Sequence, residues 1–372
     1  MYHVTRTSKA AVRRLGWIVL LLCCWCVAGM GADGTNSTVT VMTRNMDAGT
    51  DLGYLFAGTD EGSFVQGMAA TLAELQASNF QQRAARLAAE IGATKPDLVA
   101  LQEVTLWRTG PIMQPPATNI MADQLDLLLT ELAKLNLHYG VIAVQAELDA
   151  EAPVPTANID LRMTDRDAIL ANLDAPQSQF DLVNAQTHRY RAAFTFGNPI
   201  LGQISVPSGW LAVDVVVNGA KFRFVNTHLQ GTLAGIPEAT EVQRAQANEL
   251  LANFYFTGMP VVLAGDFNSN AEPGPEDTGV VRRILNAGFK DAWHSVHPGD
   301  PGYTWPLFGE DQNSGATTPN ERIDLVFAGG LLQFWFGRAP AILAADQTGN
   351  TPPFASIRRN CWTSSGSWAG GR

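Results

Sequence analysis

Hard oxygen donors directly follow a short apolar run in the second half of the chain. Residues 261–264 (V-V-L-A) are typical of a strand buried on both faces, and the run stops at Gly265 before Asp266 and Asn268. Because strand side chains alternate between faces, an acid and an amide two residues apart leave one strand end together. Ligands of open α/β sheets bind at such carboxyl ends. The alternative is a strand that ends in an ordinary turn, since Gly, Asp and Asn are common turn residues.

The same arrangement recurs at the ends of three other apolar runs, which are followed by Asn45, Glu103 and His228. The oxygen donors in this set suit a hard divalent cation, Mg²⁺ or alternatively Mn²⁺ or Ca²⁺. His228 could donate a proton or a hydrogen bond to a phosphate oxygen. An acid beside an amide could orient water, while a metal would offset the charge that gathers on the phosphorus oxygens. Hydrolysis of a phosphate ester fits all of these groups.

Each candidate also has a purely structural alternative. Glu103 could cap a helix or pair with an arginine, and His228 could be a hydrogen-bonded core histidine. Asp324 is a further site candidate, but it stands two residues after Arg322 and could simply form an ion pair with it. Trp305 is expected in the core. No P-loop, G-x-S-x-G or H-E-x-x-H motif indicates a different chemistry.

Strands and helices alternate along the chain. Strands are predicted at residues 38–43, 97–101, 140–144, 210–217, 221–225 and 322–327, and helices at residues 72–91, 122–135, 241–253 and 280–287. Asn218-Gly219 predicts a hairpin turn between its two flanking runs. A Pro-rich loop is expected at 106–119 and a polar surface excursion at 147–178, whereas residues 354–362 lack strand alternation. Interleaved elements together with a hairpin indicate a layered α/β fold with mixed sheets.

The first 32 residues differ in composition from the rest. Basic residues precede an apolar stretch at 15–28, and small residues follow at 29–32, which predicts a secretory signal peptide over residues 1–32. A retained N-terminal anchor is the alternative. Three of the four cysteines lie there, so after cleavage only Cys361 remains and no internal disulfide is expected. Cleavage would change the formal net charge from −10 to −14, which disfavours a nucleic-acid substrate.

Five motifs in order resemble those of a known family. They are T-R-N-M from residue 43, D-L-V-A-L-Q-E-V from 97, V-N-T-H-L from 225, L-A-G-D-F-N from 263 and R-I-D-L-V-F from 322. Over about residues 39–327 the chain resembles the endonuclease/exonuclease/phosphatase superfamily, in its secreted bacterial form. Its members include DNase I-like nucleases, abasic-site endonucleases, inositol polyphosphate phosphatases and neutral sphingomyelinases.

The resemblance implies a DNase I-like four-layer sandwich, in which two packed mixed β-sheets are flanked by helices. It implies a divalent metal near Asn45 and Glu103, and His228 on the phosphate. Asp266 and Asn268 would surround the nucleophilic water, and Asp324 would be the family's later structural or catalytic aspartate.

The chain departs from the family at its C-terminal end. Members close with a Ser-Asp-His or similar tripeptide, but no histidine follows His297 here. For one choice of codons that encodes residues 356–362, insertion of a single A shifts the reading frame. The shifted frame then encodes Asp-His-Ala-Gly-Thr-Val. We therefore interpret residues 33–355 as the domain and residues 356–372 as an aberrant, frame-shifted tail. A genuine tail on a chain that has lost its closing histidine is the alternative.

The sequence therefore predicts a secreted or periplasmic metal-dependent phosphoesterase, which acts on a phosphodiester or phosphomonoester. The substrate class stays open between nucleic acid, phospholipid and small molecule. One alternative is a DNase-like secreted endonuclease. Another is a catalytically dead protein of the same fold that binds a phosphate ligand. No stable protein partner and no membrane span in the mature chain are expected.

Overall fold

The computed structural model describes residues 38–54, 58–175, 180–198, 200–233, 235–272, 274, 277–306 and 318–329, together with the backbone of 341–346 and 354–358. The predicted signal peptide, Cys361 and most of the predicted tail lie outside these residues. Everything described belongs to one unit, Ser37–Ser364. No helix in this part of the chain is long and apolar enough to cross a membrane.

Two large mixed sheets form the centre of the unit. The first has the strand order β15-β16-β1-β2-β6-β3-β4, with β5 paired to β6, and the second has the order β13-β14-β12-β11-β10-β7. The strands of the first sheet are β1 (Thr38–Asn45), β2 (Leu98–Gln102), β3 (Leu106–Pro111), β4 (Asn119–Asp123), β5 (Tyr139–Val154), β6 (Ile159–Asn172), β15 (Ala341–Asp346) and β16 (Phe354–Arg358). Those of the second are β7 (Phe180–Arg189), β10 (Gly209–Val217), β11 (Ala220–His228), β12 (Val261–Asp266), β13 (Lys290–Asp291) and β14 (Asp324–Gly329).

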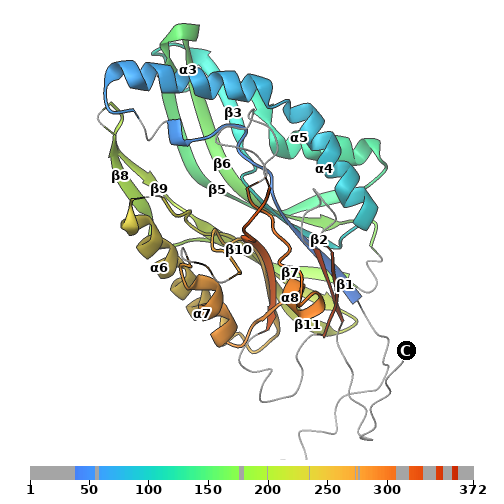
Figure 1. The fold of residues 1–372 in the computed structure, drawn as a ribbon. Coiled ribbons are helices and arrows are strands. Elements are labelled where there is room, and N and C mark those ends of the chain that lie inside the picture. Colours follow the sequence, from blue (N-terminus) through green and yellow to red (C-terminus); the bar gives the residue numbers. More distant parts are fainter. Residues whose placement is uncertain are drawn as a thin grey trace, which may run out of the picture. The chain divides into compact units, whose positions relative to one another are not determined.

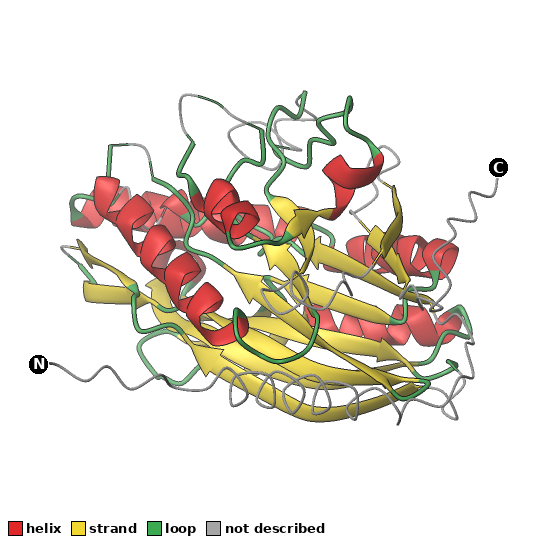
Figure 2. Cartoon of the chain, turned by 90° about the horizontal axis from the view of Figure 1, so that it is seen from below, coloured by secondary structure: helices red, strands yellow, loops and turns green. Residues whose placement is uncertain are grey.

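Helices cover the outer faces of the sheets. They are α3 (Glu61–Ala77), α4 (Phe80–Thr94), α5 (Gln124–Lys134), α6 (Pro237–Phe254) and α7 (Val280–Asn286). The short helix α8 (Ala292–Val296) instead contributes Ala292 to the cluster between the sheets, and a 3₁₀ turn η1 lies at Pro155–Ala157. Figure 1 shows α3, α4 and α5 on the side of the first sheet and α6 and α7 on the side of the second. Figure 2 shows the strands gathered between these helices. A separate two-stranded ribbon consists of β8 (Phe194–Asn198) and β9 (Gly202–Val206).

Successive side chains of each strand point to opposite faces of its sheet, and the hydrophobic core is therefore divided into three layers. In β2, Leu98 and Ala100 pack into the cluster between the two sheets, whereas Val99 and Leu101 pack against α4 and α5. In β12, Val262 and Ala264 join the cluster between the sheets, whereas the alternate residues face α6 and α7. Because each strand end is thereby fixed between two cores, a polar residue that follows it is held at a defined place.

The predicted DNase I-like sandwich of two mixed sheets flanked by helices is confirmed. The predicted hairpin is also present as β10 and β11, with Asn218 and Gly219 both at positive φ (47° and 73°) in the turn. The single predicted helix at 72–91 is wrong. Asn79 adopts a left-handed conformation (φ 48°) and its side chain caps α4, so the chain forms two helices there.

Two predicted loops are also wrong. Residues 106–111 form β3, and much of the expected excursion at 147–178 lies in β5 and β6, which pair with each other in the first sheet. The polarity of these segments was misleading because charged residues pair across the strands. Arg162 contacts Asp149 on the neighbouring strand with an Nε–Oδ1 distance of 2.7 Å.

The segment near the C-terminus also differs from the expectation. Residues 354–358 form β16, which pairs antiparallel with β1 so that Ser356 lies opposite Thr40. Backbone pairing along the edge of β1 does not require hydrophobic alternation, and so the sequence pattern did not reveal this strand.

Candidate active site

Three neighbouring strands of the second sheet bring three titratable residues into register. His228 at the end of β11 lies opposite Asp266 at the end of β12, and Asp266 lies opposite Asp324 at the start of β14. Because β12 runs parallel to β11 and antiparallel to β14, the three side chains meet at one edge of the sheet. Asn268 follows two residues after Asp266 in a left-handed turn with φ 47°.

Gly265 makes the close approach of β11 and β12 possible. A Cβ atom at this position would lie 1.9 Å from the carbonyl oxygen of Thr227. A side chain would therefore separate the two strands at the point where His228 and Asp266 meet. The glycine of the L-A-G-D-F-N motif is therefore required because any larger residue would clash with the neighbouring strand.

The first sheet contributes Asn45 and Glu103 from the ends of β1 and β2. Asn45 lies opposite Gln102, and Glu103 follows with a left-handed φ of 53°. This backbone conformation costs of the order of 1 kcal/mol or more in a non-glycine residue, and such strain clusters at functional sites. Behind the site, the Gln102 side chain donates a hydrogen bond to Oδ1 of Asn226 (2.7 Å). Asn226 is a fully buried residue of β11, so this hydrogen bond joins the two sheets.

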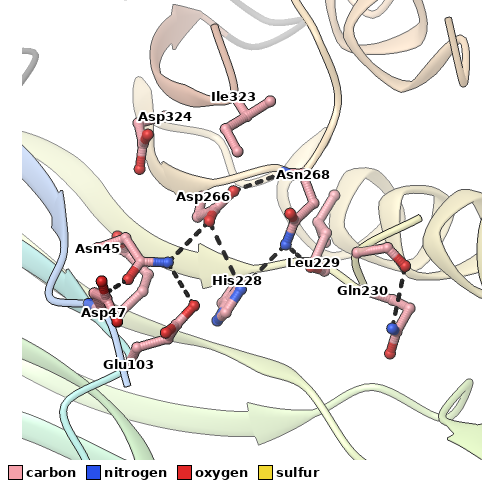
Figure 3. A network of polar contacts seen from close by, with 12 residues as sticks. Asn45, Asp47, Glu103, His228, Leu229, Gln230, Asp266, Asn268, Ile323 and Asp324 are labelled. Atoms are coloured by element: carbon pink, nitrogen blue, oxygen red, sulfur yellow. Dashed lines mark hydrogen bonds and ion pairs between the residues drawn. The ribbon is translucent and has the colours of Figure 1, made fainter. Parts of the chain in front are cut away.

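Asn45 holds the two carboxylates of the site together. Its Nδ2 donates to Glu103 Oε1 (2.8 Å) and to Asp266 Oδ2 (3.0 Å). The other oxygen of Glu103 accepts from the Ala48 N–H (2.7 Å), and Asp266 Oδ1 accepts from the Asn268 N–H (2.8 Å). Every carboxylate oxygen of the pair therefore has a donor, which fixes both groups before any ligand binds (Figure 3).

Asn268 orients the histidine. Its Nδ2 lies 3.1 Å from His228 Nε2 and donates to the Leu229 carbonyl (2.8 Å). His228 Nε2 also lies 3.8 Å from Asp266 Oδ2. The imidazole thus faces the carboxylate pair, as Figure 3 shows, and lines the same cavity.

A divalent metal fits this donor set. Ligand atoms of Glu103, His228 and Asp266 lie within 4.8 Å of one another. Burial raises the pKa of Asp266 to about 7, against the lowering effect of its hydrogen bonds from Asn45 and Asn268. A nearby divalent cation would favour the ionised form, so the buried carboxylate fits a metal centre.

Asp324 stands apart from these hydrogen bonds. Its Oδ1 is buried without a hydrogen-bond partner, and burial together with the charge of Asp266 raises its pKa to about 7. The predicted alternative for this residue, an ion pair with Arg322, does not form. Arg322 instead contacts Asp291 at 2.8 Å and Glu272 at 3.3 Å. Asp324 is thus left to face the cavity.

A cavity of about 520 Å³ opens above these residues and draws its walls from both sheets and several loops. All six residues expected at the site line it, namely Asn45, Glu103, His228, Asp266, Asn268 and Asp324. The structure therefore brings the predicted residues together, from strands that lie far apart in the sequence.

A comparison with family models identifies the chain. Residues 65–346 match the endonuclease/exonuclease/phosphatase family. The chain belongs to this family. Its members act on phosphoester bonds and typically require a divalent metal, which agrees with the donor set around Glu103 and Asp266. A search of curated proteins found no match.

A solved structure described as an endonuclease/exonuclease/phosphatase shares the fold. A protein of this description from Beutenbergia cavernae is 19% identical, with a TM-score of 0.51 over 87% of this chain and 71% of that one. Truncated Caenorhabditis elegans TDP2 is 15% identical, with a TM-score of 0.43 over 87% of this chain and 98% of its own. The human nocturnin catalytic domain is 13% identical, with a TM-score of 0.41 over 87% and 97%.

The cavity of this family member is also lined by residues that the sequence did not predict at the site. Glu147, Asp165 and Trp305 line it, although the first two were expected on a surface excursion and the third in the core. Trp305 is 51% exposed. The spacing of Asp165 and Asp167 was a usable signal, since acids two apart on a strand share a face. It was hidden because the segment did not look like a strand.

Proposed function

We propose that this protein is a secreted, divalent-metal-dependent phosphoesterase that hydrolyses a phosphodiester or phosphomonoester. The observation that carries the proposal is the convergence of Glu103, His228 and Asp266 within 4.8 Å at the floor of one cavity. Asn45 and Glu103 would hold the metal, with Mg²⁺ as the first choice and Mn²⁺ or Ca²⁺ as alternatives. When bound, the metal would neutralise charge on the phosphate oxygens.

The protein's own residues have separate roles in this proposal. His228 donates a hydrogen bond to a phosphate oxygen, and Asn268 keeps its ring in place. Asp266 accepts a proton from the attacking water in its ionised form, which a bound divalent cation would favour. Asp324 lies opposite Asp266, and the repulsion between the two acids favours the protonated form of Asp324, which could donate a hydrogen bond within the site.

We further propose the domain limits that the sequence predicts. Residues 1–32 are a signal peptide, residues 33–355 are the phosphoesterase domain, and residues 356–372 are an aberrant tail. The proposal is supported by the basic-then-apolar N-terminus and by the absence of a histidine after His297. DNA sequencing around codon 357 tests the frame shift, and codons incompatible with an Asp-His reading would exclude it.

A phosphate-ligand-binding protein without turnover is the second candidate. It is favoured by the same missing histidine, since the family's closing Asp-His pair is absent from the chain as printed. A DNase-like activity is a narrower form of the first proposal, and the acidic net charge of −10 disfavours it.

The deciding experiment compares two purified proteins, the printed chain and one with the Asp-His frame restored. Both are assayed on bis(4-nitrophenyl) phosphate with Mg²⁺, Mn²⁺ or Ca²⁺, with and without chelator. We expect turnover by the restored chain only, and we expect chelator to stop it. If a folded restored chain shows no turnover with any metal, the phosphoesterase proposal is wrong and the binding protein is favoured.

A further inference from the structure

The short loop that follows β1 supports both residues proposed to hold the metal. It comprises residues 46–49, which we call the β1 loop, and it begins directly after Asn45. The Asp47 N–H donates to Asn45 Oδ1 (2.7 Å), and the Ala48 N–H donates to Glu103 Oε2 (2.7 Å) (Figure 3). Two consecutive amides of one loop thus each hold a different proposed ligand, and the position of the loop decides how both are oriented.

The conformation of the β1 loop needs support from its surroundings. Asp47 has a positive φ of 64°, and Glu103, which follows β2, has a φ of 53°. Residues other than glycine rarely adopt this region, and they keep it only where the surrounding structure holds them there. Gly49 follows at φ 94°, and a Cβ atom there would lie 2.4 Å from Cζ of Phe80 on α4. The loop is therefore packed closely against a helix.

Two side chains from different helices hold the carbonyl groups of the β1 loop. Arg83 of α4 donates through Nη2 to the carbonyls of Met46 and Asp47, the second at 2.8 Å. Gln124 of α5 donates through Nε2 to the same Asp47 carbonyl (2.8 Å). Gln124 is 3% exposed, so water does not readily replace its hydrogen bonds. The Asp47 carbonyl is thus fixed from two directions.

Gln124 also connects the β1 loop to the backbone around Glu103. Its Nε2 donates to Thr105 Oγ1 (2.7 Å) and to the Glu103 carbonyl (3.2 Å). The two amide hydrogens are therefore shared among three acceptors, which lie in the segments after β1 and β2. Trp107 holds the next carbonyl of the loop, because its Nε1 donates to Ala48 (2.8 Å).

The two helix side chains act on the cavity only through the loop. Asp47 and Glu103 line the cavity, whereas Arg83 and Gln124 do not. A metal held there would therefore not be touched by either of them. If their role were only to stabilise the fold, their loss would lower the unfolding temperature and leave the metal affinity of the folded protein unchanged.

We propose that Arg83 and Gln124 are positioning residues for the divalent-metal site. This inference rests on the proposed function, which places the metal at Asn45 and Glu103. By holding the carbonyls of the β1 loop, the two side chains place its amides so that both ligands are oriented before a metal binds. Metal affinity should therefore depend on them.

Calorimetric titration of the full printed chain with Mn²⁺ tests the inference without requiring turnover. Gln124→Met removes the donor and keeps the length of the side chain, and Arg83→Met removes the guanidinium. We expect each of these variants, with its fold checked by circular dichroism, to bind Mn²⁺ about tenfold more weakly. Arg83→Lys retains one donor and the charge but not the planar fork, so its loss should be smaller than that of Arg83→Met.

Two control variants separate positioning from stability. Arg189→Met removes an arginine that likewise donates to two consecutive carbonyls, those of Ala146 (2.6 Å) and Glu147 (3.2 Å), on a strand that carries neither proposed ligand. Ile284→Ala removes a fully buried side chain of α7 from the core outside the second sheet. Both should leave Mn²⁺ affinity unchanged, and Ile284→Ala should lower the unfolding temperature.

The outcomes separate this inference from the proposed function. If neither the printed chain nor the frame-restored chain binds Mn²⁺, both are overturned. If Mn²⁺ binds and the variants of Arg83 and Gln124 bind it as tightly as the original chain, the inference is overturned and the proposed function survives. Equal losses of affinity in Ile284→Ala would also overturn it.

A mild variant keeps the test decisive if the others do not fold. In that case Arg83→Lys is compared alone with the original chain. Weaker binding of Mn²⁺ by folded Arg83→Lys supports the inference, and equal binding overturns it.

Discussion

Two groups of carboxylates lie at the same cavity and differ in how they are hydrogen-bonded. Glu103 and Asp266 have a donor on each of their four oxygens, from Asn45, Ala48 and Asn268. The acidic cluster of Glu147, Asp165 and Asp167 has four oxygens buried without a hydrogen-bond partner. Hydrogen bonds thus fix the first group in position, whereas in the second group burial raises the carboxyl pKa values and favours the protonated acids.

The comparison teaches that hydrogen-bond donors, and not burial alone, decide whether a carboxylate beside the cavity is held ready as an ion. Groups that take part in chemistry need fixed positions, which donors such as Asn45 supply. Carboxylates that are buried without donors lower the stability of the protein when they are ionised. The predictions below test each half of this contrast.

The largest effect is expected from the hydrogen-bonded group. In the chain with its Asp-His frame restored, Asp266→Ala should lower kcat for a phosphodiester by at least about 10³-fold, because it removes the proposed proton acceptor. Steady-state kinetics measures the loss, and circular dichroism checks the fold. Asp181→Ala on the exposed part of β7 is the matched control. Activity close to that of the control would place the catalytic base elsewhere.

A smaller loss should follow from the removal of Asn45, a proposed metal ligand that also positions both carboxylates. Asn45→Ala removes the donor shared by Glu103 and Asp266. We expect metal affinity to fall about 10- to 100-fold, as measured by titration with Mn²⁺. Asn253→Ala, at an exposed position on α6, is the control. Unchanged affinity for Mn²⁺ in Asn45→Ala would show that these hydrogen bonds do not prepare a metal site.

The acidic cluster should make stability depend on pH. Burial raises the pKa of Glu147 to about 7 from its ordinary value of 4.5. Unfolding therefore releases a proton between these pH values, so the free energy of unfolding falls as pH rises from 5 to 8. Glu147→Gln should be more stable than the original chain by about 1–3 kcal/mol at pH 8, and nearly equal at pH 5.

Urea unfolding at both pH values, with chelator present, measures this difference. Glu241→Gln on α6, where the Glu241 side chain is 70% exposed, serves as the control and should show no such pH dependence. A Glu147→Gln protein that is less stable at pH 8 would mean that the carboxylate has an unseen compensating partner in the folded state.

The smallest effect is expected from the side chain that donates to Glu147. Gln145 Nε2 donates to Glu147 Oε1 (2.6 Å), so Gln145→Met should lower the free energy of unfolding by about 1 kcal/mol at pH 8. The loss should shrink at pH 5, where Glu147 is protonated and the bond is weaker. Gln203→Met on the exposed β9 is the control, and equal losses at both pH values would contradict the assignment.

Local pattern was sufficient for the parts of the fold in which apolar residues repeat regularly. The β10–β11 hairpin was predictable because Asn218 and Gly219 are suited to a tight turn between two apolar strands. The break between α3 and α4 was not, since it depends on the left-handed conformation of Asn79. Strands β5 and β6 were missed because their charges are compensated by partners on other strands, such as Arg162 for Asp149.

The sequence alone determined which residues form the candidate site. Asn45, Glu103, His228, Asp266, Asn268 and Asp324 each follow or interrupt an apolar run, and a strand in a packed sheet delivers such a residue to the sheet edge. Only the tertiary structure decided how these residues are paired, because register fixes His228 opposite Asp266 and Asp266 opposite Asp324. The tertiary structure also brought the residues of the acidic cluster together. Their burial and their lack of hydrogen-bond donors are properties of the packed chain and are not visible in any local pattern.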